Sequence, residues 1–152
     1  TIHSSRRRFA ARLNSGVRPQ TKMIAIRADE CEVELSGTVE ELLEVGLTIR
    51  ALAASSQPSV VVPAALCSPA PYGRSLERLA VHRRPGPTVV SVAASELQVS
   101  GSDTSLNLFA SWFEFPTGVD PGYHQHFEPL EGDPDHSPAA VSLIVAVCQA
   151  GA

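Results

Sequence analysis

The stretch CEVELSGTVEELLEVGLTIRAL, residues 31–52, contains the signals of a strand, a turn and a helix in direct succession. Apolar residues alternate with polar ones up to Leu35, which predicts a strand with one buried face. Thr38 followed three residues later by Glu41 is the pattern of a capping box, in which the two residues satisfy each other's free backbone N–H groups at the start of a helix. We therefore expect a strand that leads directly into a helix.

The predicted helix has one apolar stripe. Apolar residues and one glycine recur at steps of three and four, as they do along one face of a helix: Val39, Leu42, Leu43, Gly46, Ile49 and Ala53. The glycine costs about 1 kcal/mol in helix propensity but would let the helix lie close to a sheet. Pro58 disfavours helical backbone in the residue before it, so the helix should end in the segment 55–58.

Further strands are predicted on both sides of this unit. Residues 23–36 alternate in two parts, which indicates a hairpin or a bent strand. Residues 60–62 form a short apolar run typical of a strand, and residues 63–75, rich in Pro and Ala, are predicted as an irregular loop.

The second half of the chain is predicted to consist mainly of strands. The β-branched residues of 88–94 favour a strand, and Leu97 and Val99 continue an alternating pattern. A tight turn at 101–103 would then lead into a returning strand from Leu106, completing a hairpin. The alternation slips near 109–111, which indicates a β-bulge.

The closing run, residues 138–149, is apolar at nearly every position after Ser142, as in a strand that is central in a sheet or covered on both faces. Taken together, the segments predict an α+β fold with a mainly antiparallel sheet and one principal helix packed on one face. Residues 23–152 are expected to form this single domain. Residues 1–22 contain six Lys and Arg and no Asp or Glu, and they are predicted to be a basic, flexible N-terminal extension.

Composition narrows the classes of function. Hydrophobic residues make up 43% of the 152 residues and charged residues 18%, and no apolar run approaches the roughly 20 residues of a membrane span. The net charge of −4 disfavours nucleic acid as a partner. The three cysteines are odd in number, lie far apart in the sequence and form no Cys-x-x-Cys pair. We therefore expect them to be free thiols in a reducing compartment. We expect a cytoplasmic protein that binds neither membranes nor nucleic acid.

The most reactive-looking stretch is YHQHFEPLEGDPDH, residues 123–136. In a strand His124, His126 and Glu128 would project from one face, since successive side chains alternate. Two imidazoles and a carboxylate can hold Zn or Fe(II), so a small metal-dependent enzyme is an alternative. The other histidines offer poor additional ligands, and the chain has no nucleophile elbow or Gly-rich phosphate loop. A non-enzymatic protein without a cofactor is therefore the main expectation.

Two segments resemble those of a known family. Residues 31–52, with Leu-Ser-Gly before Thr-x-Glu-Glu-Leu and a helix, and residues 123–147, with a His-x-His strand, an acidic loop and a final apolar strand, are similar to bacterial polymorphic-toxin immunity protein family thirty-two. The resemblance implies a small cytoplasmic protein that binds a cognate toxin and blocks its active site. It implies no catalysis by this chain.

A toxin-binding role also suits the carboxylates of this region. Five acidic residues fall within 16 positions with no Lys or Arg among them: Asp120, Glu128, Glu131, Asp133 and Asp135. Many toxins are basic nucleases, and an acidic loop can speed encounter with a basic surface and occupy a phosphate-binding cleft. We expect these five residues to contribute to the partner-binding surface. A structural or regulatory α+β domain is the third reading.

Overall fold

The computed structural model describes residues 23–127 and 141–149. The predicted first unit is confirmed. Strands β1 (Ile24–Ala28) and β2 (Glu32–Gly37) form an antiparallel hairpin in which Ala25 pairs with Ser36. The side chain of Asp29 closes its turn by accepting hydrogen bonds from the backbone N–H groups of Cys31, at 3.0 Å, and Glu32, at 2.9 Å.

Helix α2 (Val39–Ala53) begins at the predicted capping box. The Thr38 hydroxyl accepts a hydrogen bond from the Glu41 backbone N–H at 3.2 Å, and the Glu41 carboxylate accepts one from the Thr38 N–H at 2.8 Å. The capping box therefore satisfies two free N–H groups at the helix start with residues only three positions apart.

The remaining strands extend this hairpin into one curled, mixed sheet of nine strands within the described residues. They are β3 (Ser59–Ala65), β4 (Arg74–Leu76), β5 (Arg78–Arg83), β6 (Val89–Ala93), β7 (Glu96–Gly101), β8 (His124–Phe127) and β9 (Ser142–Val147). The order is β6-β7-β5-β3-β1-β2-β9-β8, with β4 also paired to β1. Three pairs are parallel, β1–β3, β2–β9 and β5–β7, so the α+β class is confirmed but "mainly antiparallel" fits only roughly.

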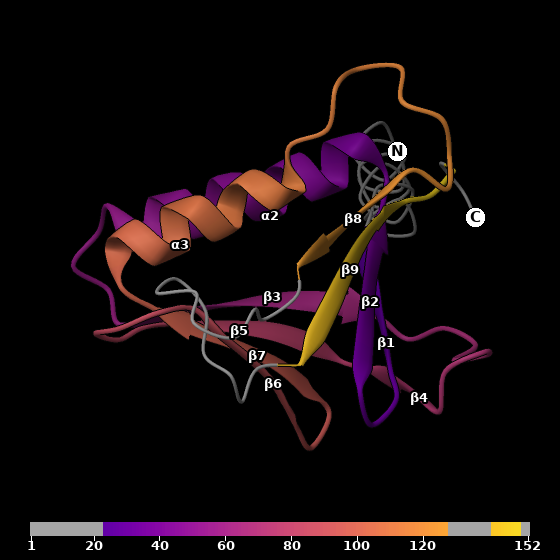
Figure 1. The fold of residues 1–152 in the computed structure, drawn as a ribbon, viewed down its shortest axis with the longest axis horizontal. Helices are drawn as coiled ribbons and strands as arrows, with labels where there is room; N and C mark the ends of the chain where they lie inside the picture. Colours follow the sequence, from indigo (N-terminus) through magenta and orange to yellow (C-terminus); the bar gives the residue numbers. More distant parts are fainter. Residues whose placement is uncertain (1–22, 128–140, 150–152) are drawn as a thin grey trace, which may run out of the picture.

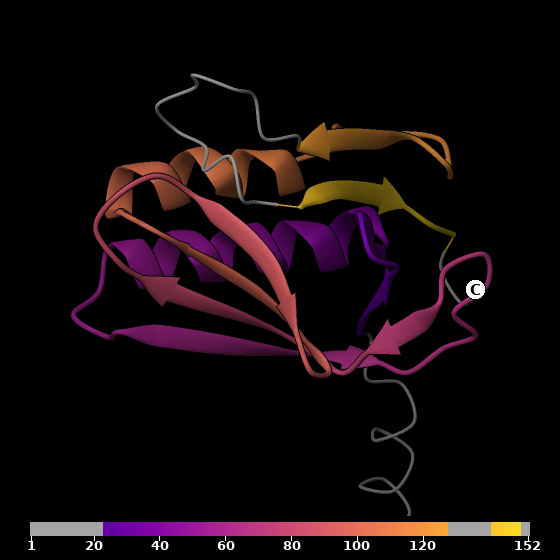
Figure 2. The ribbon, with the colours of Figure 1, turned by 60° about the horizontal axis from the view of Figure 1, so that its bottom comes forward.

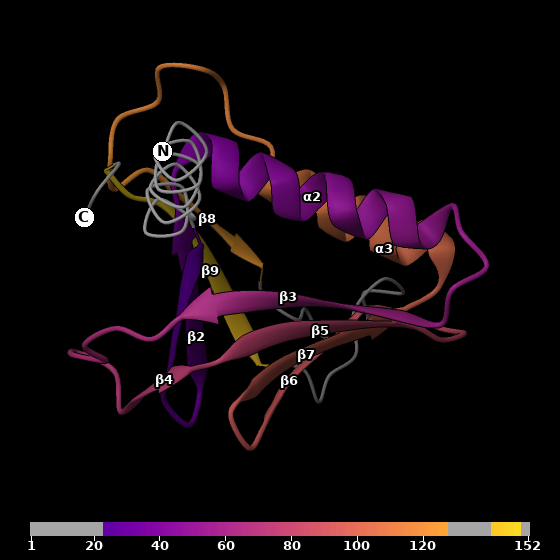
Figure 3. The ribbon, with the colours of Figure 1, turned by 180° about the vertical axis from the view of Figure 1, so that it is seen from behind.

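The sheet curls around the two helices. Figures 1 and 3 show α2 and a second helix, α3 (Asp103–Ala110), side by side over the half formed by β3, β5, β7 and β6, while β1, β2, β9 and β8 cross the end of this layer. Figure 2 shows β3 and its neighbours passing below the same helices. A backbone hydrogen bond of 2.9 Å from the N–H of Val141, just before β9, to the carbonyl of Val90 links that segment to β6, the strand at one end of the sheet.

Helix α3 corrects the prediction of a returning strand from Leu106. Ser102, placed in a tight turn by the sequence, instead caps α3 by accepting a hydrogen bond from the Ser105 N–H at 3.2 Å. Leu106 and Phe109 are buried at helical spacing, whereas Leu108 is half exposed. The slip of alternation near 109–111 marks the end of this helix and a 3-10 turn at Ser111–Phe113, not a β-bulge.

The hairpin that was predicted between the strand at 97–99 and a strand from Leu106 is instead formed by β6 and β7. Strands β6 and β7 pair antiparallel, and Ala94, with φ of 54°, lies in the short turn between them. Strand β7 then pairs in parallel with β5, a strand that no pattern in the sequence had predicted. The predicted loop over 63–75 is shorter at both ends, because β3 continues through Pro63 to Ala65 and β4 begins at Arg74.

The second helix also changes the interpretation of the apolar stripe on α2. Leu42 and Ile49 are buried as expected, but Leu43 is 43% exposed and Val45 takes a buried place instead. A Cβ atom added at Gly46 would meet Ala110 and Phe113. The glycine therefore brings α2 close to α3 and its 3-10 turn rather than to the sheet. The prediction of one principal helix therefore fits only roughly, because α3 packs beside α2.

Aromatic rings from α3, from the 3-10 turn that follows it and from β8 pack together in the core. The Phe109 ring contacts the rings of Phe113 and Phe127 edge-on, with centroid separations of 5.4 and 5.1 Å, and Trp112 lies against Phe127 at 5.7 Å. These contacts attach the short strand β8 to α3.

Strand β9 lies inside the sheet, between β2 and β8, as the apolar run predicted. Its residues are not covered equally on the two faces. Leu143, Val145 and Val147 are buried, while Ile144 and its neighbours on the other face are partly exposed. Of the helices in the described ranges, none has both the length and the apolar character of a membrane span.

Candidate functional site

The first two turns of α2 concentrate negative charge. Glu40 and Glu41 lie in the first turn, and Glu44 follows one turn later. Carboxylates are favourable at this end of a helix because the free N–H groups and the helix dipole carry partial positive charge. The stability of the helix therefore explains part of this placement. Whether the carboxylates can also bind a partner depends on the grooves that they line.

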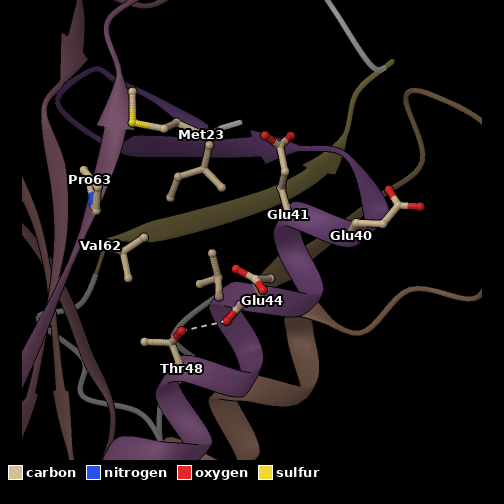
Figure 4. Close-up of a pocket in the computed structure, with 9 residues that line it drawn as sticks. Met23, Glu40, Glu41, Glu44, Thr48, Val62 and Pro63 are labelled. Atoms are coloured by element: carbon tan, nitrogen blue, oxygen red, sulfur yellow. Dashed lines mark hydrogen bonds between the residues drawn. The ribbon is translucent and has the colours of Figure 1, made fainter. Parts of the chain in front are cut away.

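A groove of about 400 Å³ lies between α2 and the neighbouring strands, and we call it the α2–β3 groove. It is lined by Met23, Ile24, Glu40, Glu41, Glu44, Val45, Thr48, Val62 and Pro63. Figure 4 shows the strands supplying apolar side chains on one side and α2 supplying the carboxylates on the other. The Thr48 hydroxyl is held by donating to the Glu44 carbonyl at 2.8 Å. None of these lining residues is Lys or Arg.

A second groove, of about 210 Å³, lies at the start of α2 beside the 117–121 loop, and we call it the α2–loop groove. Its lining residues are Thr38, Val39, Glu40, Thr117, Gly118, Val119, Pro121, Val147, Cys148 and Gln149. Glu40 therefore borders both grooves.

Asp120 is exposed on the loop that borders the second groove, between the lining residues Val119 and Pro121. The loop is fixed to the sheet because the Gly122 N–H donates to the Val147 carbonyl at 2.7 Å and the Val147 N–H donates to the Tyr123 carbonyl at 2.8 Å. Gly122 has a φ of 92°, a conformation that glycine adopts without a steric penalty. The fold thus brings the Asp120 loop to the acidic start of α2, which lies 80 positions earlier in the chain.

The other four predicted carboxylates, Glu128, Glu131, Asp133 and Asp135, lie outside the described residues. Of the five predicted partner-binding residues, Asp120 is the one whose position is given. The sequence did not reveal that Glu40 lies beside the Asp120 loop in the fold, because a glutamate at that position is the pattern of an ordinary helix start.

The two histidines share one face of β8, as the alternation predicted. His124 and His126 are both exposed, and their ring centroids lie 4.8 Å apart. The ring Nδ1 of His124 lies 3.0 Å from the Gly122 carbonyl oxygen. The third proposed ligand, Glu128, lies outside the described residues, and no group of three His, Cys, Asp or Glu that could hold a metal occurs within 23–127 and 141–149.

A polar cluster on the sheet face of β1 and β2 was also missed. Arg27 forms an ion pair with Glu34, its cross-strand partner, and donates to the Ala70 carbonyl at 2.8 Å. The Tyr72 hydroxyl donates to Glu32 at 2.9 Å, and the Arg27 guanidinium lies 5.5 Å from the Tyr72 ring centre. The hairpin register could have revealed the Arg27–Glu34 pair, whereas nothing in the sequence indicated Tyr72.

Burial, together with the hydrogen bond to Glu32, raises the pKa of the Tyr72 hydroxyl well above its usual value. The hydrogen bond to Glu34 raises the pKa of Arg27 in the same way. Tyr72 is therefore a neutral donor and Arg27 a permanent cation at ordinary pH. Their contacts fasten the loop before β4 to the first hairpin, which is a structural role.

Comparison of the chain with protein-family models, with curated proteins and with solved structures finds no match.

Proposed function

We propose that this chain is an immunity protein, which binds a cognate bacterial toxin in the cytoplasm and neutralises it without catalysis of its own. The proposal is supported by the resemblance of residues 31–52 and 123–147 to polymorphic-toxin immunity proteins. The chemistry of the surface beside α2 supports it independently of that resemblance.

The observation that carries the proposal is the meeting of two acidic segments at one groove. Glu40 lines the α2–loop groove from the helix, and the residues on either side of Asp120 line it from the loop. Val39, Val119 and Val147 contribute apolar side chains to the lining of the same groove. An apolar centre with charged groups at its edge is the usual composition of a protein-binding patch.

A basic toxin is the partner that this surface fits best. Carboxylates at the rim of an interface raise the association rate with a positively charged partner and disfavour acidic ones. A nuclease, whose active site is built to hold phosphate, is one candidate class. An inhibitory interface of about 800 Å² per partner would extend well beyond the groove itself.

Co-expression tests the proposal. The chain is expressed in a bacterial host together with the toxin domain encoded next to its gene, and colony survival is counted. The proposal predicts survival close to that of cells without toxin. Continued killing, or the lack of any toxin gene in the neighbourhood, would contradict it.

A matched pair of charge reversals tests the surface. Asp120→Lys places a cation beside the groove, where it should repel a basic toxin and weaken neutralisation. The toxin dose needed for killing should fall at least about tenfold, equivalent to about 1.4 kcal/mol of binding. Glu30→Lys makes the same charge change on the exposed turn between β1 and β2 and should leave protection unchanged. Equal effects of the two variants would exclude the groove as the binding surface.

A further inference from the structure

The α2–β3 groove is not part of the proposed toxin-binding surface. Its lining combines apolar side chains with carboxylates, so it would suit a ligand that is both apolar and positively charged. Val45, Val62 and Pro63 line it with apolar side chains. Figure 4 shows Glu41 and Glu44 on α2, across from Val62 and Pro63 on the strand. Met23, which also lines the groove, is 40% exposed. A segment that carries Lys or Arg beside apolar residues would match both features.

We propose that residues 1–22 of the same chain dock in the α2–β3 groove. This segment is joined directly to Met23, which lines the groove. An extended chain spans about 3.3–3.6 Å per residue, so Arg18 reaches up to about 17 Å from Met23 and Lys22 is adjacent to it. The occupant is therefore covalently held beside its site.

Charge complementarity supports this choice of occupant. Residues 1–22 contain six Lys and Arg and no acidic residue, whereas three glutamates and no Lys or Arg line the groove. Leu13 and Val17 lie among these cations in the sequence and supply apolar side chains for the valines and the proline of the groove.

Tethering makes such contacts sufficient. Single exposed ion pairs contribute little to stability, but a short linker gives an effective concentration in the millimolar range, so weak contacts can keep the groove occupied. Because the contacts are electrostatic and exposed, high salt should weaken them, since the Debye length falls from about 10 Å at 0.1 M to about 3 Å at 1 M.

Limited trypsin digestion of the full chain tests the docking. Cleavage after Arg8 and Arg12 is followed by mass spectrometry in the parent and in Glu41→Gln/Glu44→Gln. Glutamine keeps an acceptor for the capping box at position 41, so this variant loses charge without losing the helix cap. We expect cleavage to be faster by about fivefold or more in the variant, because digestion follows the fraction of open segment.

Glu30→Gln/Glu77→Gln is the matched control, since it removes two exposed carboxylates that do not line the groove. Its cleavage rate should equal that of the parent. If all three proteins are digested at one rate, or if both variants are digested equally fast, the docking is excluded. Protection that increases with protein concentration would also overturn it, because the segment of a second copy would then be the occupant.

The outcome is separable from that of the proposed function. Asp120→Lys should weaken toxin neutralisation and leave the cleavage rate unchanged, because Asp120 lies beside the other groove. Loss of docking in Glu41→Gln/Glu44→Gln with full protection against a toxin would support the docking and leave the toxin-binding surface where we place it.

Discussion

Gly46 of α2 lies so close to the backbone of Ala110 in α3 that a Cβ atom at position 46 would be only 3.1 Å from the Ala110 carbonyl oxygen. The same atom would lie 3.3 Å from the Cβ of Phe113. The two helices therefore approach each other at a point where only the smallest residue fits, and this contact places Phe113 in the core.

A large side chain at this contact should separate the helices. We expect Gly46→Leu to lower the free energy of unfolding by about 1–3 kcal/mol, the usual cost of overpacking. Ala51→Leu, at an exposed position of the same helix, is the matched control and should change stability little. Urea unfolding followed by circular dichroism measures both. A Gly46→Leu protein as stable as the control would refute the close contact.

The cap of α3 gives a second prediction. Ser102→Ala removes the side chain that accepts the Ser105 N–H, and it should cost about 1 kcal/mol. Ser102→Asp keeps an acceptor and should retain most of the stability. Thr104→Ala, at an exposed position in the first turn of α3, should have a smaller effect than Ser102→Ala. The same unfolding experiment checks all three. An undiminished stability of Ser102→Ala would argue for the strand and turn that the sequence first suggested.

The Tyr72 cluster predicts a loss of stability at high pH. Its raised pKa means that the folded protein holds the hydroxyl proton more tightly than the unfolded chain does. The resulting stabilisation is complete below the unfolded pKa of about 10 and is lost as the pH rises above it toward the folded value.

Tyr72→Phe removes this ionisation, so its unfolding free energy should decline less steeply above a pH of about 10 than that of the parent. Tyr123→Phe, at a side chain that is 54% exposed, controls for the loss of a tyrosine hydroxyl. Unfolding curves at several alkaline pH values give the slopes. Parallel slopes for Tyr72→Phe and the parent would mean that the cluster does not hold the proton as described.

The histidine pair of β8 separates the proposed function from the metal-enzyme alternative. We expect the purified chain to contain well under one metal ion per molecule, and His124→Ala/His126→Ala to protect against the toxin as well as the parent does. Elemental analysis and the survival assay measure these outcomes. One equivalent of Zn or Fe that is lost in the double variant would favour the metal-dependent enzyme.

Local signals in the sequence predicted local structure well. The capping box of Thr38 and Glu41 predicted the start of α2, and alternation over 23–36 predicted a hairpin or a bent strand, of which the structure forms the hairpin. Both signals depend on neighbours within a few residues. Alternation at Leu106 and Leu108 was misleading, since two apolar residues at a spacing of two do not distinguish a strand from a short helix whose cap, Ser102, looks like a turn.

Long-range features were beyond such reasoning. The parallel pairs β1–β3 and β5–β7 depend on which strands meet after an intervening segment, and no local pattern specifies that. The meeting of Glu40 with the Asp120 loop is of the same kind. The sequence therefore predicted an acidic segment at 120–135 but did not reveal that Glu40 of α2 borders the same groove as the Asp120 loop.

Complex formation between the purified chain and its toxin decides whether the chain is an immunity protein. Isothermal titration of the toxin domain into the parent, Asp120→Lys and Glu30→Lys, with toxin activity assayed on the same samples, measures binding and inhibition together. We predict a one-to-one complex that abolishes toxin activity, with affinity weakened at least about tenfold by Asp120→Lys and unchanged by Glu30→Lys. Absence of binding, or binding that leaves the toxin fully active, would contradict the account.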